Sequence, residues 1–274
     1  MPTARWHHRT DSLLRPQRKR CRPYHRRSQR PGNIAAIFLE TVVGTNGALV
    51  PPDGYLQGVR DLCTRHGILM VCDEVMVGFG RLGEWFGVDR WGVAPDLITF
   101  AKGVNSGYVP LGGVLISDEV ASYFDDRPYP GGLTYSGHPL ACAAAVESIR
   151  IFEDDMIPQR AKALGEDVIS PRLAEIAQAH PSVGEVRGLG AMFVIELVKD
   201  RDTREPLVPF NPSGAEAAPM NDVVKAVKDG GVWPFAHFNG LHIAPPLVIS
   251  EADLASGLDV IDSALDVADG YVTS

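Results

Sequence analysis

Short apolar runs separated by turn-rich stretches dominate the chain from Ile34 onward. Continuous runs of this kind are typical of strands buried in a parallel sheet. Between the first two runs, apolar residues recur at helical spacing and end at Gly67, a residue type that often closes a helix. Strands that alternate with helices predict βαβ units and therefore an α/β fold with a mostly parallel sheet. The runs are Ile34–Leu39, Ile68–Cys72, Leu97–Phe100 and Gly112–Ile116.

The pattern changes after Gly137. Residues 138–152 are rich in small side chains and predict a closely packed helix, whereas residues 159–180 predict a more amphipathic one. Val186–Lys199 alternates like a strand and predicts a single strand with a kink at its Gly-Leu-Gly sequence.

A capping signal in the sequence predicts where the last helix begins. Ser250, with Asp253 three residues later, resembles a capping box, and apolar residues then follow at helical spacing. We therefore expect a large domain over residues 34–155 and a C-terminal α+β small domain over residues 156–274.

Residues 1–33 differ in composition from the rest. They hold nine arginines and Lys19 against one acid, Asp11, although the whole chain has a net charge of −8. Three interpretations are open: an arm that binds nucleic acid or an anionic membrane, a disordered tail, or the out-of-frame translation of a GC-rich gene. The abrupt change in composition at Asn33–Ile34 favours the third, and we expect this segment to add nothing to the core.

Overall composition is that of a globular protein. Hydrophobic residues make up 45% and charged residues 22% of the 274 residues. No apolar run approaches the length of a membrane span, and no secretory signal follows the start. The cysteines lack metal-ligand spacing, so no metal site is expected, and they are interpreted as buried free thiols in the cytoplasm. The strongly acidic remainder argues against general nucleic-acid binding.

Three of the predicted strands end in charged residues, namely Glu40, Asp73 and Lys102. Because ligands bind beyond the carboxyl ends of parallel strands, these side chains would meet at one edge of the sheet and form a site. The alternative is that strand ends reach water and are often charged for that reason alone.

The neighbours of Lys102 favour a functional site. Apolar residues precede it and Gly103 follows, so we expect a partly desolvated amine with a lowered pKa, able to act as a nucleophile. Asp73 could hold a pyridine nitrogen protonated through a charge-assisted hydrogen bond. An imine-forming lysine and such a carboxylate are the minimal protein contribution to pyridoxal-phosphate (PLP) chemistry.

Several motifs, in order and spacing, resemble those of class III aminotransferases, most closely the omega (amine–pyruvate) branch. The resemblance covers residues 34–274 and implies a PLP-dependent transferase fold of type I. The motifs are Asp73-Glu74-Val75, Gly78-Phe79-Gly80-Arg81, Pro95-Asp96, Phe100-Ala101-Lys102-Gly103, Gly132-Leu133-Thr134-Tyr135-Ser136-Gly137-His138-Pro139 and Ala244-Pro245-Pro246-Leu247.

The resemblance implies a role for each matching residue. Lys102 would form the internal aldimine with PLP and later move the substrate proton, and Asp73 would bind the pyridinium. Val75 would pack on one face of the ring. Thr134 would bind the cofactor phosphate of the neighbouring subunit in a homodimer. Glu40 matches a family acid at the edge of the site.

The chain also departs from the family in two ways. Family members carry a longer segment before the position of Ile34, which normally brings a Gly-Thr-Glu-Ala-like phosphate loop and an aromatic residue that stacks on the ring, and residues 1–33 contain no such loop. Phe235 falls where many amine–pyruvate members have an arginine for the substrate carboxylate, in the candidate substrate pocket, and phenylalanine cannot make that contact.

The sequence therefore predicts a PLP-dependent transaminase that moves an amino group between an amine or amino acid and a keto acid or aldehyde, N-terminally truncated. Three alternatives stay open: a non-catalytic fragment of the same family, another PLP reaction such as an aminomutase or phospholyase, and an arginine-arm nucleic-acid binder.

Overall fold

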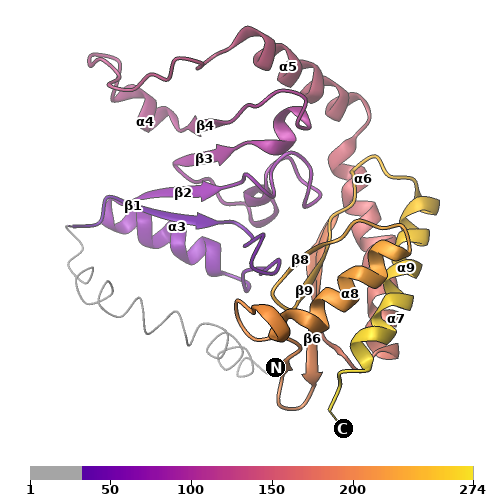
Figure 1. Ribbon diagram of the computed structural model, residues 1–274. Helices are drawn as coiled ribbons and strands as arrows, with labels where there is room; N and C mark the ends of the chain where they lie inside the picture. Colours follow the sequence, from indigo (N-terminus) through magenta and orange to yellow (C-terminus); the bar gives the residue numbers. More distant parts are fainter. Residues whose placement is uncertain (1–32, 274) are drawn as a thin grey trace.

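The computed structural model describes residues 33–273, which form two sheets with helices (Figure 1). Residues 1–32 lie outside the described residues, and so does the prediction that they add no core. The first sheet has the order β1-β2-β3-β4, with β1–β3 parallel and β4 antiparallel. This confirms the mostly parallel sheet. Its strands are β1 (Ala36–Glu40), β2 (Leu69–Asp73), β3 (Leu97–Phe100) and β4 (Gly113–Ile116).

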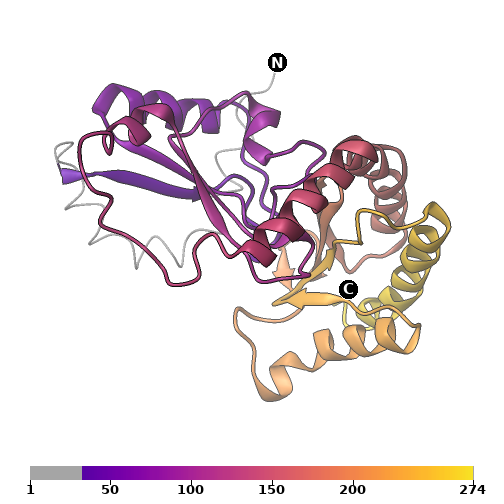
Figure 2. The same cartoon turned by 90° about the horizontal axis from the view of Figure 1, so that it is seen from above.

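Helix α3 (Tyr55–His66) covers one side of this sheet, as Figure 2 shows. Its buried residues Leu56 and Cys63 pack against Met70 and Cys72 of β2 in a common apolar cluster. The helix ends where Gly67 adopts the left-handed conformation, with φ 59°, and its N–H returns to the last turn.

Helical structure connects the two sheets. Helices α4 (Asp118–Ser122) and α5 (Pro139–Asp154) precede α6 (Ile157–Ala163) and α7 (Ser170–Ala179). The predicted helix over 159–180 is present, but residues 164–169 form a π-helical turn inside it. At this turn Gly165 lies against the backbone of Gly190, so close that a Cβ on Gly165 would be 2.1 Å from the Gly190 carbonyl oxygen.

The second sheet is antiparallel, with the order β5-β6-β9-β8 and β7 (Glu205–Pro206) paired to β6. The prediction of one kinked strand over Val186–Lys199 was wrong. Two strands run there, β5 (Val183–Leu189) and β6 (Met192–Asp200), joined by a tight turn at Gly190 with φ 55°. The Gly-Leu-Gly sequence ends a strand and reverses the chain rather than bending it.

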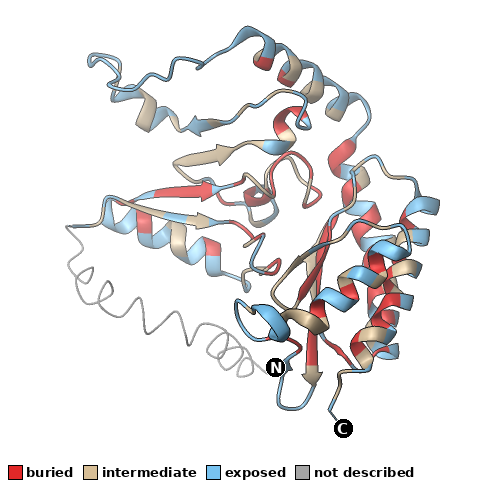
Figure 3. Ribbon diagram, viewed as in Figure 1, coloured by how far each residue is buried: buried red, intermediate tan, exposed pale blue. Residues whose placement is uncertain are grey.

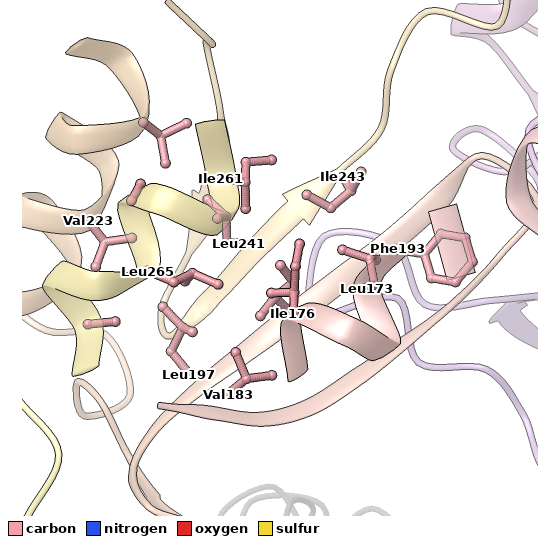
Figure 4. Close-up of a cluster of buried hydrophobic side chains, with 14 of the residues drawn as sticks. Leu173, Ile176, Val183, Phe193, Leu197, Val223, Leu241, Ile243, Ile261 and Leu265 are labelled. Carbon is pink, nitrogen blue, oxygen red and sulfur yellow. The ribbon is translucent and has the colours of Figure 1, made fainter. Parts of the chain in front are cut away.

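The core of this second unit lies between its sheet, the helical turn over residues 164–169 and helices α7, α8 and α9 (Figures 3 and 4). Strands β8 (Phe235–His237) and β9 (Gly240–Ile243) complete the sheet, with α8 (Ala218–Asp229) and α9 (Glu251–Asp269) packed on it. Ser250 caps α9 by accepting from the Asp253 N–H at 3.0 Å. The Asp253 carboxylate bonds to the Ser250 hydroxyl, not to its backbone, so only half of the expected capping box forms. None of the helices within residues 33–273 is long and apolar enough to cross a membrane.

Candidate active site

The carboxyl ends of β1–β3 point toward the second unit (Figure 1) and bring the predicted residues to one edge. Glu40 pairs in register with Asp73, and Asp73 pairs with Thr99 of β3. Lys102 follows two residues after β3 ends. Because registered partners point to the same side of a sheet, Glu40, Asp73 and Thr99 form one polar row beside the lysine.

One oxygen of Asp73 is held by the chain itself. Its Oδ1 accepts a hydrogen bond from the backbone N–H of Val75 at 2.9 Å, which fixes the orientation of the carboxylate. Its Oδ2 accepts no hydrogen bond from the described residues, and the side chain is exposed. The Val75 N–H therefore orients the carboxylate, and its second oxygen can accept a hydrogen bond from a ligand.

The backbone at Lys102 is held in an unusual conformation. Lys102 has φ 47°, in the left-handed region that costs a non-glycine residue energy and that clusters at functional sites. Gly103 packs so closely on Phe79 that a Cβ there would lie 2.9 Å from the Phe79 Cβ. Phe79 belongs to the loop that follows Asp73, so this contact ties the lysine turn to the aspartate loop.

The expected desolvation of Lys102 was wrong for the part of the chain that the structure describes. The side chain is exposed, as are Asp73 and Glu40. Apolar neighbours in sequence pack inward beneath the site, through Val104 and Phe100, and leave the amine uncovered. Burial of this lysine would require polypeptide beyond the described residues or a bound ligand.

Glu74 holds the strand ends at this edge in place, and its position in the sequence did not predict that role. It is fully buried and accepts hydrogen bonds from the Thr41 hydroxyl and from the N–H groups of Gly87 and Val88, at 2.7 and 3.0 Å. Burial raises the pKa of its carboxyl group, and the three hydrogen bonds oppose that shift. Because Thr41 follows Glu40 and Glu74 follows Asp73, this carboxylate fixes the ends of both strands.

Arg81 joins the two units next to the site. Its guanidinium donates to the carbonyl oxygens of Ala191 at 3.0 Å and Pro245 at 2.7 Å, and its own carbonyl accepts from the Ala191 N–H. Burial lowers the pKa of this guanidinium to about 10, so it stays charged at neutral pH. Arg187 makes a second link by donating to the Gly47 carbonyl at 2.6 Å.

Of the remaining predicted residues, Val75 is next to Asp73, whereas Thr134 and Phe235 lie on other segments of the chain. Thr134 is exposed in the segment before α5. Val75 is partly buried beside Asp73. Phe235 begins β8, is half-exposed, and has its ring 4.8 Å from that of His242. The roles assigned to these three residues stay predictions.

The structure thus has a mostly parallel sheet with a lysine and an aspartate at its carboxyl edge, beside an antiparallel α+β unit. Known proteins of similar sequence and structure identify the family to which this arrangement belongs. The family model "Aminotransferase class-III" matches residues 13–265. A solved structure of taurine:2-oxoglutarate aminotransferase from Bifidobacterium kashiwanohense, in complex with PLP and glutamate, superimposes with a TM-score of 0.85 at 38% identity. The chain belongs to the class III aminotransferases.

Proteins of similar sequence are also aminotransferases. 4-Aminobutyrate aminotransferase GabT of Escherichia coli is 40% identical over 243 residues, which cover 87% of this chain and 54% of GabT. Putrescine–pyruvate aminotransferase of Pseudomonas aeruginosa is 38% identical over 235 residues, which cover 85% of this chain and 50% of that enzyme. The taurine:2-oxoglutarate aminotransferase match covers 97% of this chain and 56% of that structure. The chain thus spans about half the length of the relatives it matches.

Proposed function

We propose that this chain carries the lysine and the ring-nitrogen partner of a PLP-dependent aminotransferase, which moves an amino group between an amine or amino acid and a keto acid or aldehyde. The observation that carries the proposal is the placement of Asp73 and Lys102 at one carboxyl edge of a parallel sheet, on adjacent strands.

The residues at this edge fit PLP by their chemistry. Lys102 offers a primary amine for the cofactor aldehyde, and Asp73 offers an oriented carboxylate with one uncommitted oxygen. The Thr99 hydroxyl, in register with Asp73, is buried and has no hydrogen-bond partner among the described residues. An unpaired buried hydroxyl beside the carboxylate is a polar group that an added ligand or polypeptide can satisfy.

Each residue then has a defined task. Asp73 would accept a hydrogen bond from the ring N–H of bound PLP and favour the protonated nitrogen, while the Val75 N–H holds the carboxylate in place. Val75 would pack on one ring face, and Thr134 would bind the cofactor phosphate of the neighbouring subunit in a homodimer. Glu40 lies in the same row as Asp73, at the margin of the site.

Lys102 moves the proton. Bound PLP supplies an electron-withdrawing ring that stabilises negative charge on the carbon bearing the amino group. The Lys102 Nζ would be the base that takes a proton from that carbon and the acid that returns it, and an amine must be neutral to accept a proton.

The relatives' names support a terminal amine as donor. They include aminotransferases for 4-aminobutyrate, putrescine, 5-aminovalerate and taurine. Each of these compounds carries a primary amine on a terminal carbon. Phe235 cannot bind a carboxylate through paired N–H groups, so we propose that a substrate carboxylate is recognised elsewhere in the site.

A non-catalytic fragment is the second candidate, favoured by the exposure of Lys102 and Asp73. The phosphate, the ring and the ring nitrogen must all be held, and the described residues supply chiefly the last. We therefore expect this chain alone to bind PLP weakly and to turn over amines slowly.

Visible absorption spectroscopy tests the proposal. PLP added to the purified chain should produce a protein-dependent band that Lys102→Ala abolishes and Lys225→Ala, at an exposed lysine of α8, leaves unchanged. 4-Aminobutyrate should remove the band, and 2-oxoglutarate should restore it. No band dependent on Lys102 would indicate the non-catalytic fragment, and a band that reacts with amines without any need for a keto acid would indicate another PLP reaction.

A further inference from the structure

The turn that follows β1 holds an asparagine directly before a glycine. The Gly44 carbonyl accepts hydrogen bonds from the N–H groups of Gly47 and Ala48, both at 3.0 Å, so Thr45 and Asn46 form the tip of a tight turn. Both tip residues are exposed, and the Asn46 side chain makes no hydrogen bond to any residue between 33 and 273. Exposed turn tips open more readily than the strands they follow, and opening releases the Gly47 nitrogen.

An asparagine followed by glycine can lose its side-chain amide without an enzyme. The Gly47 nitrogen, once solvent base has removed its proton, attacks Cγ of Asn46; the new C–N bond closes a succinimide ring, and Nδ2 leaves as ammonia. Water then opens the ring at either carbonyl. One product is aspartate with a normal backbone, and the other is isoaspartate, whose backbone contains one additional carbon. Glycine permits the attack because it has no Cβ to hinder the nitrogen, and asparagine is thermolabile through reactions of this kind.

A second Asn-Gly sequence in the chain, Asn239-Gly240, lies in a protected position. It belongs to the hairpin between β8 and β9. The Asn239 side-chain amide donates to the Leu197 carbonyl at 2.9 Å, and the Asn239 carbonyl accepts from the Leu197 N–H at 2.8 Å. Gly240 is buried and pairs in register with both His237 and Glu196. Attack on the Asn239 side chain would therefore require these strands to separate first.

The turn at Asn46 joins the margin of the candidate active site to the second unit (Figure 1). The Gly44 N–H donates to Oε2 of Glu40 at 2.9 Å, and the Gly47 carbonyl accepts from Nε of Arg187 at 2.6 Å. An isoaspartate at position 46 adds a backbone carbon between these two contacts, so both cannot keep their positions. The turn cannot expand toward the second unit either, because a Cβ on Gly47 would already lie 2.6 Å from Nη2 of Arg187.

We propose that Asn46 is a site of spontaneous deamidation, and that its isoaspartate product weakens the link between the two units beside the candidate active site. Water is the co-reactant, and ammonia is the leaving group. Asn239 stays intact in the folded protein, because its side-chain amide is held by Leu197. The proposal requires no bound PLP, so its outcome is independent of the proposed function.

Peptide mass spectrometry of the whole chain, aged at mildly alkaline pH, tests the site. Asn46 should convert to aspartate and isoaspartate at least about tenfold faster than Asn239, since the β8–β9 hairpin opens more rarely than the turn. In urea that unfolds the chain, the two rates should converge. Asn46→Gln should abolish modification at position 46 and leave the rate at Asn239 unchanged. Equal rates in the folded chain, or no isoaspartate at position 46, overturn the proposal.

Urea unfolding tests the consequence for the link between the units. The aged, modified chain should unfold at a lower urea concentration than fresh protein, whereas Asn46→Gln aged in the same way should not change. Asn46→Asp has the new charge on a normal backbone and should unfold like fresh protein. Unchanged unfolding of the modified chain overturns the proposed weakening. Equal weakening in Asn46→Asp also overturns it, because the charge and not the longer backbone would then be the cause.

Discussion

Replacing Arg81 by methionine should destabilise the protein by about 2–4 kcal/mol. The guanidinium satisfies the carbonyls of Ala191 and Pro245, and an unsatisfied buried carbonyl costs about 1–3 kcal/mol. Ala191 is fully buried, so its carbonyl bears the larger cost, whereas Pro245 is only partly buried and can regain water. The backbone hydrogen bond between Ala191 and Arg81 persists in the variant and limits the loss.

Urea unfolding followed by tryptophan fluorescence and circular dichroism measures this loss. Because Arg81 joins the two units, the unfolding transitions followed by fluorescence and by circular dichroism should no longer coincide in Arg81→Met. One unit should unfold at a lower urea concentration than the other. The stability of Arg81→Lys should fall between that of the unsubstituted protein and that of Arg81→Met, since an ammonium lacks the planar fork that reaches both carbonyls. Arg90→Met, at an exposed arginine of the same stretch, is the control. A loss below about 0.5 kcal/mol for Arg81→Met, within the range of ordinary surface substitutions, would refute the reasoning.

Three further predictions concern the second unit. Burial lowers the pKa of His180, but hydrogen bonds and charges from two aspartates of α9 outweigh it and raise the pKa, so the stability it contributes is present below about pH 6.5 and is lost as pH rises through the folded-state pKa. Urea unfolding at several pH values should show this slope, and His180→Gln should flatten it; an unchanged slope contradicts the assignment. Gly165→Ala should lower the melting temperature by several degrees, since its Cβ meets a backbone oxygen of the β5–β6 turn, and an unchanged melting temperature would show that the turn can shift. Ser250→Ala should cost about 1 kcal/mol by removing the cap of α9, whereas Ser250→Asp should retain most of it.

The elements that could be predicted from sequence are those with local signals. Apolar runs predicted all four strands of the first sheet, and the position of Glu40, Asp73 and Lys102 after three of them predicted the shared edge. The carboxyl ends of parallel strands lie at the same edge of a sheet, so a residue that directly follows an apolar run can be placed at that edge from local sequence alone.

Other features depend on contacts far along the chain. Glu74 is interpretable only once Thr41 and Gly87 are known to donate to it, and an acid beside another acid at a strand end otherwise looks solvated. The reversal at Gly190 depends on its packing against Leu82 and Arg81, which no local pattern shows. The exposure of Lys102 could not be predicted either, because a local sequence shows which neighbours are apolar and not which side they cover.

Trapping the cofactor on the protein tests the central claim most directly. PLP at a low ratio to the whole chain, followed by borohydride reduction to make the bond to an amine permanent, allows the modified lysine to be located by peptide mass spectrometry. The account predicts that Lys102 carries most of the label and that Asp73→Asn lowers its share, since Asp73 holds the ring in place. Label spread over Lys162, Lys199 and Lys225 to the same extent as Lys102, and indifferent to Asp73→Asn, would contradict it.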